Sequence, residues 1–344
     1  MKTTKVHFTD THIELAHGAG GKASRRLIEG LLVPYLMKDT LTELNDAAYV
    51  DAEGRRLAFT VDSYVVKPLV FPGGSIGELA INGTVNDLAM GGAKPLAMVT
   101  TLILEAGLAA SELEREVAAM AKAAQRAGVP VVGGDTKVVE HGKADGLYIT
   151  TAGIGLTDPR VHLSSQNVRP GDQVILSGPI GDHGITVLLA RGELDLEADL
   201  TSDTRPLWPF VAALTEVAAP GLRWMRDPTR GGLATALNEL ARDARVAVML
   251  EEEAIPVRPA VRGACEILGL DPLHIANEGQ FVAIVSPEHA DIALDALRRV
   301  PGGEDARRIG EIQEEPKRVV LARSRYGGTR VIDMLVGDPL PRIC

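Results

Sequence analysis

The chain has 344 residues, and its 36 Lys and Arg against 46 Asp and Glu give a formal net charge of −10. This length exceeds one ordinary core and suits two domains of roughly 150 residues each. With 45% hydrophobic and 24% charged residues, the composition excludes global disorder, and the acidic balance excludes a nucleic-acid-binding surface spread over the whole protein.

Cysteine usage and hydropathy narrow the class of protein further. The two cysteines, Cys265 and Cys344, are too few for a disulfide framework. The polar N-terminus does not resemble a signal peptide, and no uncharged apolar run of about 18 residues predicts a membrane span. Aromatic residues make up only 3%, which argues against stacking platforms for bases. We therefore expect a cytoplasmic protein without nucleic-acid or membrane partners.

The first half of the chain mixes strand and helix patterns. A glycine-punctuated segment opens the chain, and a helix is predicted over 24–36. A helix over 75–90 shows apolar residues at helical spacing and ends at two glycines. A second helix over 111–127 begins with a Ser111–Glu114 capping box and ends at a glycine. The predicted strands cover 57–61, 96–104, 129–132 and 147–154.

The second half shows the same mixture after a turn signal at 169–172. The predicted helices cover 184–190, 203–217, 232–242, 259–268 and 288–300, and the predicted strands cover 173–176, 246–250, 281–285, 318–321 and 329–332. The predicted fold class is therefore mixed α/β, with two domains of similar size. We expect an N-terminal segment over 1–45, domains over 46–157 and 158–335, and a flexible, extended tail over 336–344, whose two prolines exclude a helix.

One glycine-rich segment has the composition of a phosphate loop. Gly18, Gly20 and Gly21 would let backbone N–H groups approach phosphate oxygens, and Lys22 would add a positive charge. The segment is not a Walker A motif, because its first required glycine is replaced by alanine and Lys22 is followed by alanine. The alternative is a plain flexible loop.

Aspartates stand at the predicted ends of several elements: Asp46, Asp62, Asp87, Asp135 and Asp227. A carboxylate at a strand end is exposed and yet held by a rigid element. If these side chains converge, they form an oxygen-ligand site for Mg²⁺, which bridges nucleotide phosphates. If they do not converge, each is an independent cap or turn former. The spacing alone leaves both interpretations open.

Cys344 is the last residue of the chain and follows a proline-rich tail. Eight extended residues span up to roughly 25 Å, so the tail would place a thiol nucleophile on a tether able to visit two different sites. The alternative is a frayed terminus with no role.

Taken together, these motifs resemble the HypE-type hydrogenase maturation proteins, a family of carbamoyl dehydratases, over essentially the whole chain. The matching segments are 18–22, 45–48, 60–62, 82–92, 133–137, 226–232, 276–279 and the ending 341–344. The central motifs are shared with a wider superfamily of ATP-binding enzymes that includes aminoimidazole ribonucleotide synthetase, thiamine-monophosphate kinase and selenophosphate synthetase. Only the cysteine-terminated tail is specific to the maturation family.

The resemblance implies an aminoimidazole ribonucleotide synthetase-like fold, a homodimer paired through the N-terminal sheets, and ATP with Mg²⁺ as cofactors. The implied nucleotide-binding residues are Gly18, Gly20, Gly21, Lys22, Asn86, Thr136 and Asp227, and the implied metal ligands are Asp46, Asp62, Asp87 and Asp135. It also implies that a HypF-like carbamoyltransferase loads the Cys344 thiol. ATP-dependent dehydration then leaves a thiocyanate, and a HypC–HypD-like complex receives the cyano group that becomes a cyanide ligand of nickel–iron hydrogenase.

Dehydration of a primary amide requires a good leaving group on the oxygen and a base near the nitrogen. Lys137, His141 and Glu278 are the candidates for that base. Two other functions remain open: a sister enzyme such as a thiamine-monophosphate kinase, and a non-catalytic carrier scaffold. A selenophosphate synthetase is disfavoured, because no cysteine lies in or near the glycine-rich segment.

Overall fold

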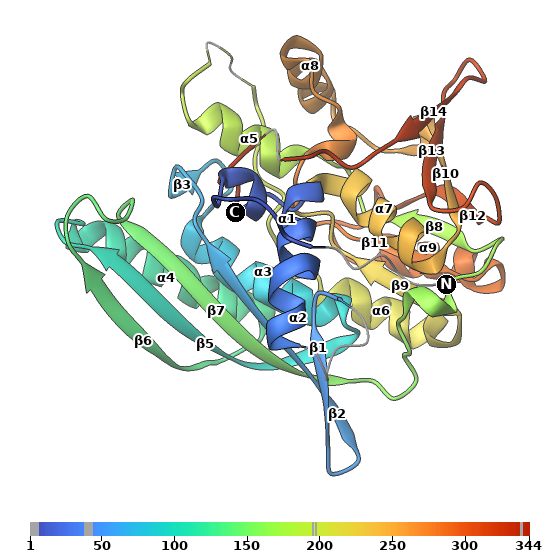
Figure 1. Cartoon of the computed structure of the whole chain (residues 1–344). Helices are drawn as coiled ribbons and strands as arrows, with labels where there is room; N and C mark the ends of the chain where they lie inside the picture. The colour runs from blue at the N-terminus through green and yellow to red at the C-terminus, as the bar shows by residue number, and fades with distance from the viewer. Residues whose placement is uncertain (1–6, 38–43, 195, 197, 338–339) are drawn as a thin grey trace.

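The computed structural model describes residues 7–37, 44–194, 196, 198–337 and 340–344, which form two mixed α/β halves (Figure 1). The predicted fold class is therefore confirmed. In this described part of the chain, no helix is long and apolar enough to cross a membrane.

The N-terminal half is a five-stranded sheet in the order β1-β2-β7-β5-β6, covered on one face by two helices. Its elements are β1 (Ala48–Ala52), β2 (Arg55–Tyr64), β3 (Val70–Phe71), β4 (Gly74–Ser75), α3 (Ile76–Met90), β5 (Ala93–Glu105), α4 (Ala110–Ala127), β6 (Val131–Val139) and β7 (Leu147–Thr157). Residues alternate along β7 between buried and half-buried, as a sheet with one covered face requires. On the other face, Phe59, Val61 and Val99 are exposed, Val61 by 66%.

The C-terminal half is a seven-stranded sheet in the order β14-β13-β10-β12-β8-β11-β9, with helices on both faces. Its elements are β8 (Gln173–Leu176), α5 (Asp182–Ala190), α6 (Trp208–Ala218), β9 (Leu222–Arg226), α7 (Gly232–Ala244), β10 (Ala247–Glu251), α8 (Pro259–Leu268), β11 (Val282–Val285), α9 (Pro287–Arg299), β12 (Arg307–Gln313), β13 (Val319–Arg323) and β14 (Thr329–Ile332). Val282 and Ile284 face the core on the α7 side, whereas Ala283 and Val285 face α6 and α9. β11 is buried on both faces, and this explains why its four residues, Val282–Val285, are all apolar.

Some predicted boundaries are wrong. β6 runs from Val131 to Val139 rather than over 129–132, because it pairs in parallel with β5 as far as Glu105. The helix predicted over 203–217 begins at Trp208, and the capping box at Ser111 is absent, because α4 begins one residue earlier with Ala109 as its N-cap. The helix predicted over 24–36 is divided into α1 (Lys22–Leu27), a π-helical turn (Ile28–Leu32) and α2 (Val33–Leu36).

The tail is the main correction to the predicted fold. Leu340 and Ile343 are only 3% and 2% exposed and belong to the core cluster formed with α3 and α5. The described residues of the tail are docked rather than free, and they are bent rather than extended, since Arg342 has a φ of 55°. Its root is held as well, because the backbone N–H groups of Lys22 and Ala23 donate to the carbonyls of Leu335 and Val336.

Candidate functional site

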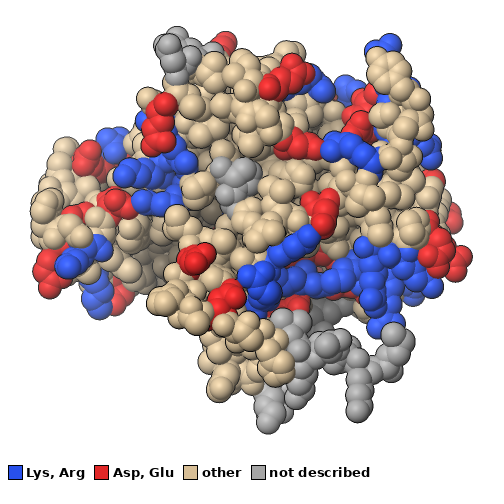
Figure 2. Space-filling model, turned by 45° about the horizontal axis from the view of Figure 1, so that its top comes forward, with Lys and Arg blue, Asp and Glu red and all other residues tan. Residues whose placement is uncertain are grey.

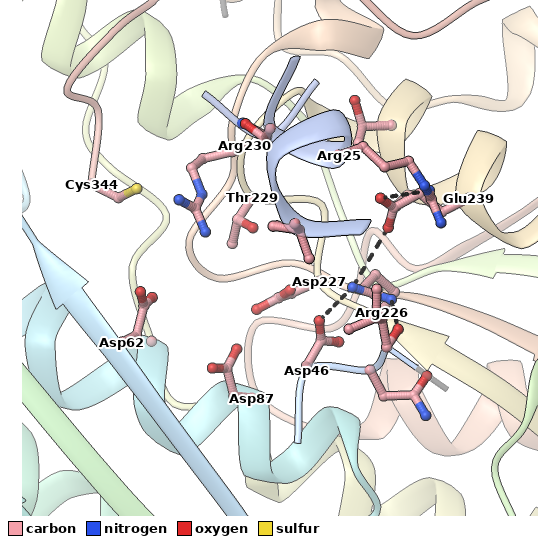
Figure 3. A pocket seen from close by; sticks show the side chains of 18 of the residues that line it. Arg25, Asp46, Asp62, Asp87, Arg226, Asp227, Thr229, Arg230, Glu239 and Cys344 are labelled. Atoms are coloured by element: carbon pink, nitrogen blue, oxygen red, sulfur yellow. Dashed lines mark hydrogen bonds and ion pairs between the residues drawn. The ribbon is translucent and has the colours of Figure 1, made fainter. Parts of the chain in front are cut away.

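A cavity of about 380 Å³ lies between the two halves and beneath the N-terminal segment (Figure 3). α1, β2 and α3 supply one part of its lining. The chain from the end of β9 into α7, the loop before β11, and the C-terminal residue supply the rest. The site therefore exists only because elements distant in the sequence meet there.

Three of the predicted aspartates converge at the floor of this cavity. Asp46 precedes β1, Asp87 lies on α3, and Asp227 follows β9; one carboxylate oxygen from each lies within 4.8 Å of the others. Burial raises the pKa of all three, that of Asp46 to about 6. The negative charges of Asp227 and Asp46 raise the pKa of Asp87 further, and the charge of Asp46 raises that of Asp227. The Thr60 hydroxyl donates to Asp87 at 2.7 Å.

This cluster fits a divalent metal ion. Its donors are all carboxylate oxygens, which a hard cation such as Mg²⁺ prefers. The guanidinium of Arg226 pairs with Asp46 at 2.7 Å, whereas Asp87 and Asp227 form no ion pair within the described residues. Three carboxylates held this close, one buried and two half-buried, repel one another, and a cation between them would relieve that repulsion.

A network of ion pairs closes one end of the cavity. Arg226 also approaches Glu239 of α7 at 3.7 Å, and Arg25 of α1 pairs with the same glutamate at 3.1 Å (Figure 3). The N-terminal segment is thereby tied to the C-terminal half across the site. Sequence reasoning missed both arginines as site residues, although Arg226 directly precedes Asp227 and could have been found by that adjacency.

Glu278 and Asp62 complete the acidic lining. Asp62 projects from β2 into the cavity, and Glu278 reaches it from the loop before β11. Glu278 is only 4% exposed, and burial, followed by the negative charge of Asp227, raises its pKa well above the usual range. A carboxyl group with a raised pKa is suited to accepting a proton.

The docked tail places Cys344 in the same cavity. Its side chain points towards Arg230, which donates a hydrogen bond to the carbonyl of Gly18 at 3.2 Å (Figure 3). The negative charge of Cys344 raises the pKa of Arg230, which therefore stays positively charged. The C-terminal residue, a carboxylate cluster and a fixed cation thus line one cavity.

The glycine-rich segment meets the cavity only in part. Gly18 and Gly20 line it, and their nucleotide contacts stay a prediction. Gly21 instead packs on the tail root, where an added Cβ would lie 2.4 Å from the carbonyl oxygen of Leu335. The Lys22 ammonium pairs with Asp333 at 2.6 Å, so within this chain its charge is neutralised outside the cavity lining.

Asn86 also lies outside the cavity lining. Its side-chain amide donates to the carbonyls of Arg205 and Glu278 at 3.0 and 3.1 Å, and its carbonyl accepts from the N–H of Leu207 at 2.8 Å. The prediction of a direct nucleotide contact finds no support within one chain. Asn86 joins α3 to the C-terminal half and holds the backbone of the residue that carries a cavity carboxylate.

Four predicted residues lie away from the cavity of their own chain. Asp135, Thr136 and Lys137 are in the middle of β6, not at a strand end, because the strand continues to Val139. Asp135 pairs with Lys137, and His141 lies beside Glu105 at 3.3 Å. Within the described part of a single chain, Asp135 therefore does not converge with Asp46, Asp87 and Asp227.

The distribution of charge is uneven despite the acidic total. Lys and Arg side chains gather into a band on one face of the molecule, bordered by acidic residues (Figure 2). A chain with a net charge of −10 thus still presents a local positive surface to an anionic ligand.

Comparison with known proteins agrees with this architecture. Residues 44–157 match the N-terminal domain, and residues 169–322 the C-terminal domain, of AIR synthase related proteins. The carbamoyl dehydratase HypE of Azotobacter vinelandii is 50% identical over 341 residues, 99% of this chain and 100% of the relative. The HypE of Escherichia coli K12 is 45% identical and covers 97% of this chain and 99% of its own.

Solved structures show the same similarity. A HypE–HypF complex matches with a TM-score of 0.85 and 41% identity, over 90% of this chain and 99% of the other. A HypE maturation protein in complex with ATP matches with a TM-score of 0.81 and 45% identity, over 97% and 100%. A thiamine monophosphate kinase from Aquifex aeolicus, at 22% identity and a TM-score of 0.62 over 84% and 97%, shares the fold alone. With half of its residues identical to a HypE over nearly the full length of both proteins, this chain belongs to the HypE family of carbamoyl dehydratases.

Proposed function

We propose that this protein dehydrates a carbamoyl group carried on its own Cys344 thiol to a thiocyanate, at the expense of ATP. The observation that carries the proposal is the position of Cys344 in one cavity with the carboxylate cluster, Glu278 and Arg230. A carrier alone would need a tether, but it would have no need of a metal-type carboxylate cluster beside the thiol.

ATP would bind in this cavity, in line with the ATP complex of a similar HypE. Asp46, Asp87 and Asp227 would hold Mg²⁺, which supplies charge neutralisation for the phosphates; Asp62 lines the same cavity. Gly18 and Gly20 lie at the cavity wall, where the Gly20 N–H donates to the Ser24 hydroxyl at 2.8 Å. We keep Asp62 as a candidate ligand of the metal ion.

The proposed dehydration has two steps, phosphorylation of the carbamoyl oxygen and elimination of phosphate. The oxygen of the carbamoyl group that Cys344 carries attacks the γ-phosphorus of ATP, and ADP leaves. The phosphorylated group loses one of its two nitrogen protons to solvent; the bond between carbon and that oxygen then breaks, phosphate departs, and a base removes the second nitrogen proton, which gives the nitrile of a thiocyanate. Glu278 is the candidate base in this chain, and Arg230 is placed to bind the departing phosphate.

We also propose that two copies pair through the open faces of their N-terminal sheets. The support is the exposed apolar surface that includes Phe59, Val61 and Val99. Asp135 and Lys137 share this face, because they pair in register with Thr101 and Ile103 of β5. In a dimer, Asp135 and Lys137 would contribute to the cavity of the second copy. Thr136 and His141 would lie near that cavity as well.

The Cys344 thiol needs one partner that supplies its carbamoyl group and another that accepts the cyano group. A HypF-like carbamoyltransferase would supply the carbamoyl group, as the HypE–HypF complex of a relative suggests. A HypC–HypD-like complex carrying iron would accept the cyano group for a nickel–iron hydrogenase. Both transfers require the docked tail to leave the cavity.

The test is to incubate the carbamoylated protein with Mg²⁺ and ATP and to measure its intact mass. The expected result is the loss of one water molecule from the adduct, dependent on ATP and absent in Glu278→Gln. An adduct that keeps its mass while ATP is consumed would favour a carrier scaffold. Phosphorylation of thiamine monophosphate by the same sample would favour the sister kinase.

A further inference from the structure

The loop before β11 carries Glu278 into the cavity, and two buried asparagines bind that loop. Asn86, on α3, is 1% exposed, and Asn277, the residue before Glu278, is fully buried. Asn86 directly precedes Asp87, a member of the carboxylate cluster. Each asparagine therefore stands next to an acidic residue of the cavity, while its own side chain lies outside the cavity lining.

Asn86 uses its whole side-chain amide to bind backbone groups. Nδ2 donates to the carbonyls of Glu278 and Arg205 at 3.1 and 3.0 Å, and Oδ1 accepts from the N–H of Leu207 at 2.8 Å. Successive positions on a helix point about 100° apart, so Asp87 faces the cavity while Asn86 faces the C-terminal half. The carbonyl of Glu278 is thus fixed to the residue beside a cluster aspartate.

Asn277 makes the equivalent connection to a second aspartate of the cluster. Its Nδ2 donates to the carbonyl of Pro228, the residue after Asp227, at 2.9 Å, and its backbone N–H donates to the same carbonyl at 3.0 Å. Nδ2 also donates to the Ile275 carbonyl at 2.8 Å, and Oδ1 accepts from the N–H of Gly181 at 2.7 Å. The loop is therefore also fixed to the chain that carries Asp227.

Asp203, in the loop before α6, binds the other backbone group of Glu278. Its Oδ1 accepts from the Glu278 N–H at 3.0 Å, so the N–H and the C=O of this one residue are both bound by side chains from outside the loop. Gly279 packs so closely that an added Cβ would lie 1.7 Å from the Asp203 carbonyl oxygen. A shift of the loop would leave buried polar groups unpaired, which is costly. The loop therefore has one preferred position.

From these contacts we propose that Asn86 and Asn277 are positioning residues for the dehydration. They hold the candidate base Glu278 at a fixed place relative to two carboxylates of the cluster. The inference rests on the proposed function, because it takes Glu278 as the base of the elimination step. A base must lie within hydrogen-bond reach of the proton it removes, and a misplacement of about 1 Å costs on the order of 100-fold in rate. The effect of the two asparagines therefore falls on elimination.

The kinetic test separates the two steps in the carbamoylated protein. Asn86→Ala removes both donors and the acceptor of the side-chain amide. In a single turnover with Mg²⁺ and ATP, thiocyanate should form roughly 100-fold more slowly than in the unaltered protein. The rate of ADP formation and the KM for ATP should each stay within about twofold, because the lost contacts act only on the base. Glu278→Gln should show the same division between the steps.

Asn238→Ala, on α7, is the matched control. The Asn238 Nδ2 also donates to two backbone carbonyls, those of Ala234 and Ile332, at 2.8 and 3.0 Å, and neither belongs to the loop before β11. Both steps should keep their rates in this variant. Equal slowing of both steps in Asn86→Ala would indicate a general weakening of the fold and would overturn the proposal. An unchanged rate of thiocyanate formation would overturn it as well.

Hydrogen exchange followed by mass spectrometry tests the same contacts without ATP, Mg²⁺ or a carbamoyl group. The backbone N–H groups of Asn277 and Glu278 are both hydrogen-bonded. A peptide covering 276–281 should exchange several-fold faster in Asn86→Ala, and at the unaltered rate in Asn238→Ala, because local opening of the loop becomes easier. Unchanged exchange in Asn86→Ala would overturn the claim that this side chain holds the loop.

A second variant covers the case in which Asn86→Ala fails to fold. Asn277→Asp keeps the side-chain shape and the Oδ1 acceptor but loses both side-chain donors, and it should give the same kinetic and exchange results. The failure of the proposed function has a different signature. Full thiocyanate formation by Glu278→Gln would refute the assignment of the base, whereas the exchange rates depend only on the contacts of the loop.

Discussion

The clearest quantitative prediction concerns Asp203, in the loop before α6. Its Oδ1 accepts from the N–H of Glu278 at 3.0 Å, whereas its buried Oδ2 has no partner among the described residues. Burial, with the charge of Asp182 as a smaller cause, raises the pKa of Asp203 to about 6. Since an unfolded aspartate has a pKa of about 3.9, the folded state binds this proton more tightly than the unfolded state.

The sign of the pH dependence follows. Because the folded pKa is raised, the contribution of Asp203 to the free energy of unfolding falls as pH rises from about 4 to about 6 and then levels off. Two pKa units at 1.36 kcal/mol each make that loss about 3 kcal/mol. Asn has the same shape, keeps the Oδ1 acceptor and carries no charge. Asp203→Asn should therefore be more stable than the unaltered protein by up to about 3 kcal/mol at pH 7.5, with little difference near pH 4.

Urea unfolding followed by tryptophan fluorescence provides the assay. The two tryptophans, Trp208 and Trp224, lie on α6 and β9, in the same half of the molecule as Asp203. The control is Asp295→Asn, an exposed carboxylate on α9, for which we expect a change within about 0.5 kcal/mol at every pH. A gain for Asp203→Asn that does not vary with pH, or a loss of stability at pH 7.5, would refute the reasoning.

Three further predictions follow from the site. Asp87→Ala should abolish magnesium-dependent ATP turnover while circular dichroism stays unchanged; full turnover with normal magnesium dependence would contradict the metal assignment. Val61→Glu on the open sheet face should convert a dimer into monomers in sedimentation velocity at micromolar concentration, whereas Val217→Glu on α6 should not; a monomeric unaltered protein would remove the basis for this prediction. Cys344→Ala should keep the fold and ATP binding but accept no carbamoyl group, which intact-mass spectrometry checks.

The sequence predicted best those helices whose apolar residues recur at helical spacing. The helix expected over 259–268 has the bounds of α8, and that expected over 75–90 is α3 with its N-cap. The aspartates at 46, 87 and 227 were also found, because a carboxylate at the end of a rigid element is a local feature. Their convergence was left open by the sequence, since it depends on how α3 packs against the C-terminal half.

The remaining features depend on contacts between distant segments. Nothing local in 133–137 distinguishes a strand end from a strand interior; the parallel partner β5 decides it. The tail was expected to bury little, because prolines and a chain terminus are typical of disorder. The tail is nevertheless ordered, because the side chains of Leu340 and Ile343 pack into the apolar core cluster. The role of Asn86 likewise became visible only once the backbone of Glu278 lay beside it.

The fixed root of the tail determines how the thiol is supplied to the cavity. Val336 is anchored to the N-terminal segment next to the site, so a tether of only eight residues separates Cys344 from a fixed point. A free chain of that length has a root-mean-square span of roughly 16 Å. The local concentration of the thiol is then on the order of millimolar or higher. The chain should therefore process its own tail with first-order kinetics, independent of protein concentration, and tails from other copies should compete only when a longer inserted linker dilutes the resident one.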